Sequence, residues 1–600
     1  MSDLKSRSQT AASRANQVSE HLTSSSNQQG RNPQEQLPKQ QSSNTSARRR
    51  RRKSKKEDGD LPADYSDILG HLTKLRTLAN TPDHTRRGYM RQKQNGKLWV
   101  RERIHLLFDK DSFREIGEAT GHVVWKPIGT NGIREEPESF TPHNNVQGFG
   151  TLNGRKVVFT ADDFSIRAGH QDGHLMAKTI HTEKLALQLK LPMIKLTDGS
   201  SGGGSVTSIE KQGFSYVPPM TGFDIVQAQL NAGIPNLGAV LGPAIGLGAA
   251  RVVSCHFSVM AEDVGSLFNA GPNVVAKATF EEGLSFTDLG GPGMHCTNGT
   301  IDNLASDEKG CFEQMRTVLG FLPNCGTMMP PVGNTTDEVG RENVELRTMV
   351  PRKRERMFSM RTIISTVVDE GSWFEIGPLW GQTAICGLAR LGGKPIGIFG
   401  NNPEVLTGAL DAAGSQKLIR HLKFCDVFNL PLLQFVDVPG YAVGTVAERT
   451  ATMRWGVELT KAYYTTTMPI FSVIVRKTYG VAGGVIVDCR DPHHRVAWPS
   501  GEWGSLPLDG GIEVGHAHEL RQTEKEKGVE ARQARYKELE TMYRRLMNPV
   551  RTANHFSAEE IIDPATTRRV VANWVDMVYD ALLPERILQR ACGKLQPVYA

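Results

Sequence analysis

Apolar positions gather in short unbroken runs that end in glycine-rich sequence. Residues 156–160, 191–198 and 394–400 are such runs, and polar residues do not alternate with apolar ones along them. Runs of this kind predict strands that are covered on both faces. A glycine-rich turn and then a helix, such as residues 177–189 or 416–428, complete the recurring unit. The pattern predicts an α/β fold.

The same landmarks occur twice, in the same order. Asp111-Ser-Phe-Arg-Glu-Ile-Gly117 returns as Gly371-Ser-Trp-Phe-Glu-Ile-Gly377. Further matched pairs are residues 148–154 with 387–393, 191–198 with 430–437, 234–235 with 468–469, and 265–267 with 504–506. The offsets between partners are 260, 239, 239, 234 and 239 residues. We predict an internal duplication, with domains at residues 61–340 and 341–600 behind a tail of residues 1–60.

Glycine loops follow the strands in both predicted domains. Asp198-Gly-Ser-Ser-Gly-Gly-Gly204 is matched by Asp437-Val-Pro-Gly440, and a second loop closes each half, at residues 242–248 and 479–484. Loops without side chains expose backbone N–H groups that can stabilise an oxyanion. The alternative is that these glycines only permit tight packing of strands on helices.

Side chains suited to catalysis are hard to find. The sequence has no H-E-x-x-H or Walker motif. His170 and His174 flank Asp172, but a loop or capping role is favoured over metal binding, and no metal site is predicted. Asp198 and Asp437 are expected to cap turns after their strands.

The net charge of +7 comes from the N-terminus. Residues 1–56 hold 13 Lys and Arg against three acids, so the rest of the chain is near −3. The tail is Ser-, Gln- and Arg-rich and predicts disorder. Its run at residues 48–53 is interpreted first as a solvated linker, with a nuclear-localisation or polyanion-binding patch and a mitochondrial presequence as alternatives. Asp3 and Glu20 count against the presequence, so the cytoplasm is preferred over the mitochondrial matrix.

Eight cysteines are scattered without a C-x-x-C pair, which predicts buried reduced thiols and neither a disulfide framework nor a zinc site. No apolar run reaches 18 residues, so no membrane span is predicted. The nearest stretch, residues 234–250, is predicted to be a buried strand and turn. The near-neutral body predicts no nucleic-acid surface beyond the tail.

Several longer segments resemble the carboxyltransferase (β) subunits of propionyl-, acetyl- and methylcrotonyl-CoA carboxylases. They are Ser266-Leu-Phe-Asn-Ala-Gly-Pro-Asn-Val-Val275, Phe424-Cys-Asp-Val-Phe-Asn-Leu-Pro-Leu-Leu433, Asp437-Val-Pro-Gly440, Arg476-Lys-Thr-Tyr-Gly480 and Glu560-Ile-Ile-Asp-Pro564. The resemblance runs from about residue 88 to 568. It implies two tandem crotonase-like domains, the first holding an acyl-CoA and the second carboxybiotin.

The resemblance also implies a chemistry and a set of site residues. A carboxyl group passes from carboxybiotin to the α (or vinylogous γ) carbon of the acyl-CoA, through enolates held in backbone oxyanion holes. The implied catalytic positions are Gly202, Gly203, Val481 and Ala482. The implied substrate-binding positions are Gly204, Gly246, Gly248, Gly440, Gly480 and Gly484.

The machinery implied by the resemblance is incomplete in this chain. A biotinyl A-M-K-M sequence and an ATP-binding motif are missing, so biotin is expected on a biotin carboxylase or carrier partner. Family members assemble as hexamers, with sites formed between two subunits. The first loop of the family usually reads S-G-G-A-R, and this chain has Ser205 in place of the arginine. The second usually reads Y-G-G-A-Y-D or Y-G-A-G-N, and this chain has Gly484 in place of a residue that selects the acyl group in some members.

Three other functions stay open at this stage. The same fold serves decarboxylation of a malonyl-type CoA or transcarboxylation. A non-catalytic assembly subunit and a polyanion-binding protein acting through residues 48–56 are the remaining alternatives.

Overall fold

The computed structural model describes residues 64–128, 134–170, 176–201, 206–217, 220, 222–353 and 356–599. Residues 71–600 form one compact unit, and of the preceding unit only residues 64–70 are described. The predicted disordered tail, residues 1–60, lies outside the described residues.

The first sheet is built by the N-terminal half of the chain. Its strands run in the order β1 (Arg114–Glu115), β4 (Asn145–Leu152), β5 (Arg155–Asp162), β6 (Met193–Gly199), β7 (Asn236–Ile245), β8 (Phe257–Ala261) and β10 (Asn303–Ala305), and β9 (Ser266–Phe268) also pairs with β7. The pairs β1–β4 and β4–β5 are antiparallel, and the remaining pairs are parallel. The buried side chains of β6 and β7 explain why the sequence shows unbroken apolar runs here.

The second sheet repeats this design. Its order is β11 (Phe374–Ile376), β12 (Ala384–Leu391), β13 (Lys394–Asn401), β14 (Leu432–Val438), β15 (Ile470–Tyr479) and β16 (Arg495–Ala497), with β17 (Glu502–Gly504) on β15. The first two pairs are again antiparallel and the others parallel. Even the register irregularity is repeated, between Thr197 and Gly199 in one sheet and between Val436 and Val438 in the other. The predicted α/β fold and its duplication are confirmed.

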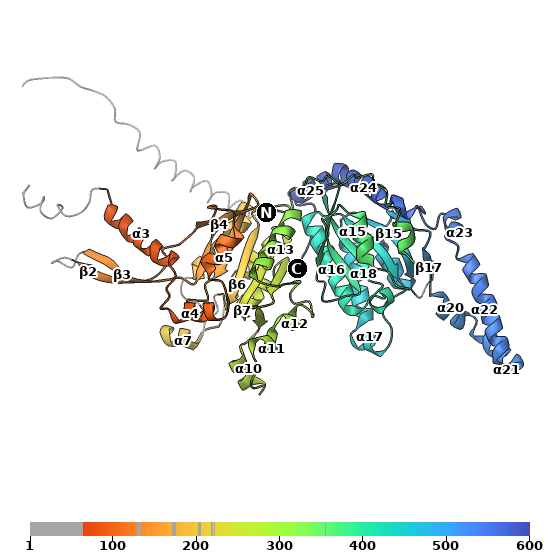
Figure 1. Cartoon of the computed structure of the whole chain (residues 1–600), viewed down its shortest axis with the longest axis horizontal. Helices are drawn as coiled ribbons and strands as arrows, with labels where there is room; N and C mark the ends of the chain where they lie inside the picture. The colour runs from red at the N-terminus through yellow and green to blue at the C-terminus, as the bar shows by residue number, and fades with distance from the viewer. Residues whose placement is uncertain are drawn as a thin grey trace, which may run out of the picture. The chain divides into compact units, whose positions relative to one another are not determined.

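A hairpin inserted in the first half explains the changing offset. The offset falls from 260 to 239 residues between the first two landmark pairs. Strands β2 (Gly121–Ile128) and β3 (Arg134–Pro142) lie at this point and pair only with each other, and the second half has no counterpart among its described residues (Figure 1).

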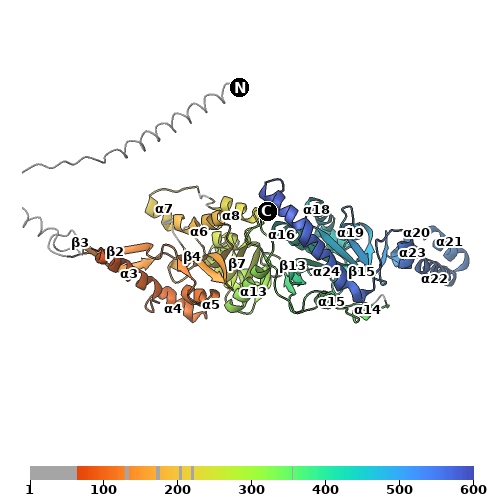
Figure 2. The same cartoon turned by 90° about the horizontal axis from the view of Figure 1, so that it is seen from above.

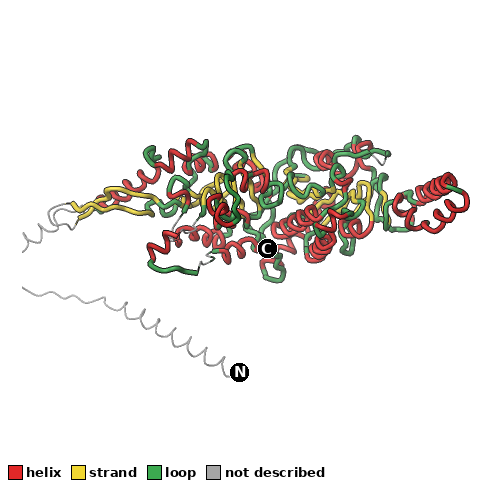
Figure 3. The backbone as a smooth tube through the Cα atoms, turned by 90° about the horizontal axis from the view of Figure 1, so that it is seen from below, coloured by secondary structure: helices red, strands yellow, loops and turns green. Residues whose placement is uncertain are grey.

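Helices cover both faces of each sheet. On the first sheet α6 (Met176–Leu189) and α8 (Phe223–Asn231) lie on one face, with α5 (Val100–Leu107) and α13 (Glu308–Phe321) on the other (Figure 2). On the second, α16 (Ala412–Phe428) and α18 (Thr452–Thr465) lie opposite α15 (Met360–Val367) and α24 (Thr567–Met577). Strands therefore lie between helical layers (Figure 3), as the unbroken apolar runs require.

The remaining helices connect or extend these layers. They are α3 (Ser66–Asn80), α4 (Arg87–Gln94), α7 (Val206–Gln212), α9 (Leu247–Val253), α10 (Pro272–Ala278), α11 (Phe286–Gly290), α12 (Pro292–His295), α14 (Leu346–Met349), α17 (Thr445–Arg449), α19 (Gly480–Ile486), α20 (Leu508–Gly515), α21 (Ala517–Lys527), α22 (Val529–Leu546), α23 (Pro549–Asn554) and α25 (Leu583–Ala591). Short turns η1 (Arg167–Gly169), η2 (Leu406–Gly408), η3 (Pro564–Thr566) and η4 (Val578–Leu582) complete the order.

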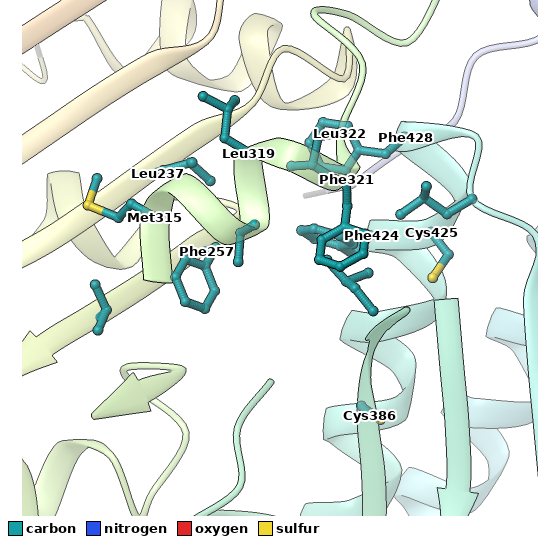
Figure 4. Packing of buried hydrophobic residues seen from close by; sticks show 14 of the residues in the cluster. Leu237, Phe257, Met315, Leu319, Phe321, Leu322, Cys386, Phe424, Cys425 and Phe428 are labelled. Atoms are coloured by element: carbon teal, nitrogen blue, oxygen red, sulfur yellow. The ribbon is translucent and has the colours of Figure 1, made fainter. Parts of the chain in front are cut away.

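The two halves share a hydrophobic core. Met315 and Phe321 of α13 belong to the same buried cluster as Phe424 and Phe428 of α16 (Figure 4). The C-terminal segment adds polar links, because the backbone N–H of Tyr599 donates to Asn231 (3.0 Å) while its hydroxyl lies 3.4 Å from Nε of Arg420. This packing fixes one half against the other, and the predicted boundary at residues 340 and 341 stays a prediction.

The structure tests two predictions that concern the whole chain, one about membrane spans and one about cysteines. Within the described residues no helix has the length and apolar character needed to cross a membrane. Six of the eight cysteines are buried free thiols, whereas Cys489 is half-buried and Cys592 is exposed. The prediction of buried thiols is therefore wrong for Cys592, which lies just after the end of α25.

Candidate functional site

Each half brings a loop and a helix N-terminus together at the carboxyl edge of its sheet. In the first half the loop follows β6 and the helix is α9; in the second they are the loop after β14 and α19. Both helices begin at a glycine with positive φ, Gly246 (55°) and Gly480 (61°). Only glycine adopts this conformation without strain, so the two residues serve as turns that aim a helix N-terminus at the strand end.

The N-terminus of α19 presents the predicted donor pair. Val481 and Ala482 belong to the first turn, where backbone N–H groups have no acceptor within the helix. Val481 is exposed and Ala482 is buried. The helix dipole favours negative charge at this end. Two adjacent N–H groups at a helix N-terminus can therefore stabilise an enolate oxygen.

Open space surrounds two of the predicted glycines of the second half, Gly440 and Gly484. A Cβ built on Gly440 or Gly484 would meet no atom within 4 Å. Gly440 has φ of 142°, so a side chain would also strain its backbone. The site therefore has room for a ligand beside α19, and the roles of Gly440, Gly480 and Gly484 in binding it stay predictions.

The matching site of the first half is only partly described. Gly202, Gly203 and Gly204 lie outside the described residues. The preceding part of their loop packs on α9, because a Cβ on Gly248 would lie 2.4 Å from the carbonyl oxygen of Gly199. Packing thus accounts for the glycine at position 248, and a substrate contact by Gly246 or Gly248 stays a prediction.

The structure adds one candidate donor that sequence reasoning missed. Leu247 is the first residue of α9, after Gly246, just as Val481 comes after Gly480 at the start of α19. The offset of 234 residues, applied to Val481, gives Leu247. The internal duplication therefore indicates Leu247, but a search for glycine residues passes over it because Leu247 is not a glycine.

Asp198 and Asp437 are not turn caps, contrary to the sequence prediction. Asp198 is fully buried and meets Nζ of Lys97 at 2.5 Å and Nη1 of Arg103 at 2.9 Å. Asp437 meets Nη2 of Arg476 at 2.9 Å and accepts from the backbone N–H of Lys477 at 2.8 Å. Buried carboxylates need such partners, and theirs come from other parts of the chain. Both aspartates thus anchor the strand ends below the loops.

Burial shapes the ionisation of the group around Asp198. Burial lowers the pKa of Lys97 below its usual value, although the Asp198 carboxylate opposes this shift. For Arg103 burial also acts to lower the pKa, but the carboxylates of Asp198 and Glu308 outweigh it and the pKa is raised. Arg103 therefore stays charged beneath the site.

Asp162 and Asn401 occupy equivalent positions under the two loops. The backbone N–H of Asp198 donates to Oδ2 of Asp162 (3.3 Å), and that of Asp437 donates to Oδ1 of Asn401 (3.2 Å). Ser201 also donates to Asp162. Burial raises the pKa of Asp162 to about 6, against the effect of the nearby Arg251. The first half thus carries an ionisable group where the second half has a neutral amide.

This difference predicts a pH-dependent stability. A carboxyl pKa raised from 3.8 to about 6 means that the native state holds a proton that the unfolded state has lost. The free energy of unfolding therefore falls as the pH rises from about 4 to about 6, by roughly 3 kcal/mol. Asp162→Asn should remove this fall and be more stable than the parent at pH 7. Urea unfolding across this pH range measures it, and parallel pH profiles of parent and variant would contradict the assignment.

The histidine and metal predictions concern the loop after η1. Nδ1 of His170 lies 2.8 Å from Oγ of Ser200, so His170 joins two loops. Asp172 and His174 lie outside the described residues. Among the residues that the structure does describe, no group of three His, Cys, Asp or Glu side chains is placed to hold a metal ion.

Comparison with known proteins identifies the family. The carboxyl transferase domain family matches residues 91–589. The chain belongs to this family. The propionyl-CoA carboxylase β chain of Saccharopolyspora erythraea is 30% identical over 540 residues, covering 86% of this chain and 95% of that protein. The methylmalonyl-CoA decarboxylase subunit α of Veillonella parvula is 30% identical over 495 residues, covering 81% and 91%.

A solved structure supports the fold. The crystal structure of transcarboxylase 12S, a hexamer with methylmalonyl-CoA and methylmalonic acid bound, matches with a TM-score of 0.74 at 26% identity. The match covers 87% of this chain and 96% of that one. The predicted relation to the carboxyltransferase subunits of acyl-CoA carboxylases, and the predicted enzyme activity of that class, are confirmed.

Proposed function

We propose that this carboxyltransferase moves a carboxyl group between carboxybiotin, carried by a separate protein, and the α (or vinylogous γ) carbon of an acyl-CoA. One observation carries the proposal. Each half ends in the same arrangement of a glycine loop and a helix N-terminus that follows a glycine with positive φ. The reaction passes through two enolates, and a protein with two backbone anion sites suits it.

Each half binds one of the two reactants. The first half, with the loop after β6 and the N-terminus of α9, holds the thioester oxygen of the acyl-CoA. The second half, with the N-terminus of α19, holds the ureido oxygen of biotin, and the open space at Gly440 and Gly484 fits a ligand there. When bound, carboxybiotin would supply the carboxyl group and then the base that accepts the α-proton. The chain's own task is to orient both partners and to stabilise negative charge on oxygen.

Exposed apolar side chains follow both loops in sequence and favour assembly. Val206 begins α7 in the first half, and Val443, Val446 and Val481 lie in and after the loops of the second, each at least 71% exposed. Such residues on one monomer predict a protein contact. We propose a hexamer in which Gly202–Gly204 of one subunit faces Val481–Gly484 of another. Sedimentation should show an oligomer, and an active monomer would refute this arrangement.

The direction of transfer depends on the partners. The decarboxylase subunit and the transcarboxylase among the relatives make decarboxylation or transcarboxylation the second candidate. A biotin carboxylase and carrier partner would instead make the complex a carboxylase. Co-purification with a biotinylated polypeptide and ATP-dependent fixation of bicarbonate by the complex support the carboxylase. Loss of carboxylate by the complex with its biotinylated partner, without any ATP-dependent fixation of bicarbonate, would support the second candidate.

In the proposed hexamer Gly484 of one subunit faces the acyl-CoA site of another, so it gives a prediction about selectivity. Because no atom lies within 4 Å of a Cβ at this position, an aspartate is accommodated and would project into the space beside α19. Gly484→Asp should lower kcat/KM for long acyl-CoAs about 10-fold more than for short ones, since it removes room and adds charge. Gly484→Ala is the matched control. Unchanged ratios across a series of acyl lengths would place Gly484 outside the acyl pocket.

A further inference from the structure

Arg251 of α9 reaches from its helix to the loop that follows β6. Its Nη1 donates to the backbone carbonyl oxygen of Ser201 at 3.4 Å. The Arg251 side chain is only 11% exposed, so this contact is largely shielded from water. Gly248 lies one helical turn earlier and packs on the same loop, because a Cβ there would lie 3.0 Å from Oγ of Ser201. One face of α9 is therefore joined to Ser201 at two points.

Ser201 has a backbone conformation that its surroundings must hold. Its φ is 48°, in the left-handed region that residues other than glycine rarely adopt. The buried Ser201 hydroxyl donates to Asp162 on β5, and the Ser201 carbonyl oxygen accepts from Arg251. Backbone strain of this kind persists only where neighbouring groups impose it. We call Asp162, Ser201 and Arg251 the loop clamp.

Arg251 is itself fixed on the side away from the loop. Its Nη2 meets Oε1 of Glu183 on α6 at 3.0 Å, and Nζ of Lys195 on β6 lies 3.3 Å from the same oxygen. Burial acts to raise the pKa of Glu183, but Lys195 and Arg251 outweigh it and the pKa is lowered. Glu183 therefore stays charged and anchors the guanidinium group. The planar fork of arginine lets one side chain bridge this carboxylate and the loop carbonyl.

The described residues of the second half show no equivalent of the loop clamp. An offset of 234 residues relates α9 to α19 and gives Val485 for Arg251. An offset of 239 relates the two strand ends and gives Gly440 for Ser201. Val485 is apolar and Gly440 has no side chain, so neither can form these side-chain hydrogen bonds. The repeated fold therefore forms without a clamp, and the clamp points to a task that belongs to the first half.

We propose that Arg251 is a positioning residue for carboxyl transfer, which aligns the loop after β6 with the N-terminus of α9. Arg251 lies on the same helix as the candidate N–H donor Leu247. It also holds Ser201, which comes directly before Gly202 in the sequence. Arg251 acts through Ser201 and not by contact with a reactant. The inference rests on the proposed function, because it concerns the site of the proposed acyl-CoA enolate.

Arg251→Met should lower kcat for transfer from a malonyl-type CoA to free biotin about 10- to 100-fold, because small misplacements of donors are costly in the transition state. KM for the acyl-CoA should change less than about 3-fold. Arg251→Lys should recover part of the loss, because lysine keeps the charge beside Glu183 but lacks the fork.

Arg155→Met is the matched control. Arg155 on β5 also joins two segments of the first half, through the side chain of Asn324 and the carbonyl oxygen of Leu319, both at 2.6 Å. This variant should lose stability and keep the kcat of the parent. A loss of kcat in Arg251→Met no larger than in Arg155→Met, or a loss through KM alone, would overturn the assignment. If Arg251→Met does not fold, Arg251→Lys takes its place with an expected loss of about 3- to 10-fold, and full activity would overturn the assignment.

Hydrogen exchange separates the loop clamp from the reaction. If the parent chain transfers no carboxyl group, the proposed function fails, and the clamp is judged on the backbone amides of residues 193–201. These amides should exchange about 10-fold faster in Arg251→Met than in the parent, and at the parent rate in Arg155→Met. Equal exchange in the two variants would refute the loop clamp.

Discussion

Val481→Pro should lower kcat for carboxyl transfer about 100- to 1000-fold, the usual cost of losing one oxyanion donor. Proline removes the backbone N–H of this residue while its φ suits the first turn of a helix. Gly480 before it has no side chain to clash with the proline ring. The measurement is the rate of transfer from a malonyl-type CoA to free biotin, with the melting temperature as a check on folding.

Val481→Ala is the matched control for this prediction. It keeps the N–H and shortens an exposed side chain, so its kcat should stay within about 3-fold of the parent. KM should change little in the proline variant, because a donor that strengthens in the transition state acts on kcat. A folded Val481→Pro enzyme as active as Val481→Ala would remove this N–H from the site.

Arg103→Met should lower the free energy of unfolding by about 3–5 kcal/mol, the cost of breaking a buried charge cluster from one side. Arg103 is fully buried, contacts both Asp198 and Glu308, and donates to the carbonyl oxygen of Leu241 at 2.8 Å. Its removal leaves two carboxylates with Lys97 as their remaining close cation. Urea unfolding at pH 7 provides the measurement.

Two comparisons make the Arg103 prediction specific. Arg532→Met breaks the partly exposed pair with Glu513 (2.8 Å) and should cost under about 1 kcal/mol. The triple variant Arg103→Met, Asp198→Asn, Glu308→Gln should recover part of the loss, because no charge is left unpaired. If Arg103→Met lowers the free energy of unfolding no more than Arg532→Met does, the buried charge cluster does not support the site.

The sequence predicted the repeated architecture because duplication leaves ordered landmarks. Strands β6 and β14 lie where the runs at residues 191–198 and 430–437 placed them, and each is followed by a glycine loop. Unbroken apolar runs report burial on both faces, which is a local property of the chain. The inserted hairpin β2–β3 was visible as well, as a change of offset.

The electrostatic support of the site could not be predicted in the same way. Arg103 and Asp198 lie 95 residues apart, and Arg103 and Glu308 lie 205 apart, so nothing local signals their contact. An aspartate at the end of a strand, just ahead of a glycine loop, has the local features of a turn cap, whereas Asp198 and Asp437 instead pair with arginines from other parts of the chain.

The most direct test of the account is a transfer of labelled carboxylate by the purified chain. A malonyl-type CoA with a radiolabelled carboxyl group is mixed with free biotin, without ATP or any partner protein. The account predicts that label appears in carboxybiotin as the acyl-CoA product forms in equal amount, and that Val481→Pro suppresses both. Release of label at the same rate with and without biotin, or no turnover by the folded oligomer, would contradict carboxyl transfer as its function.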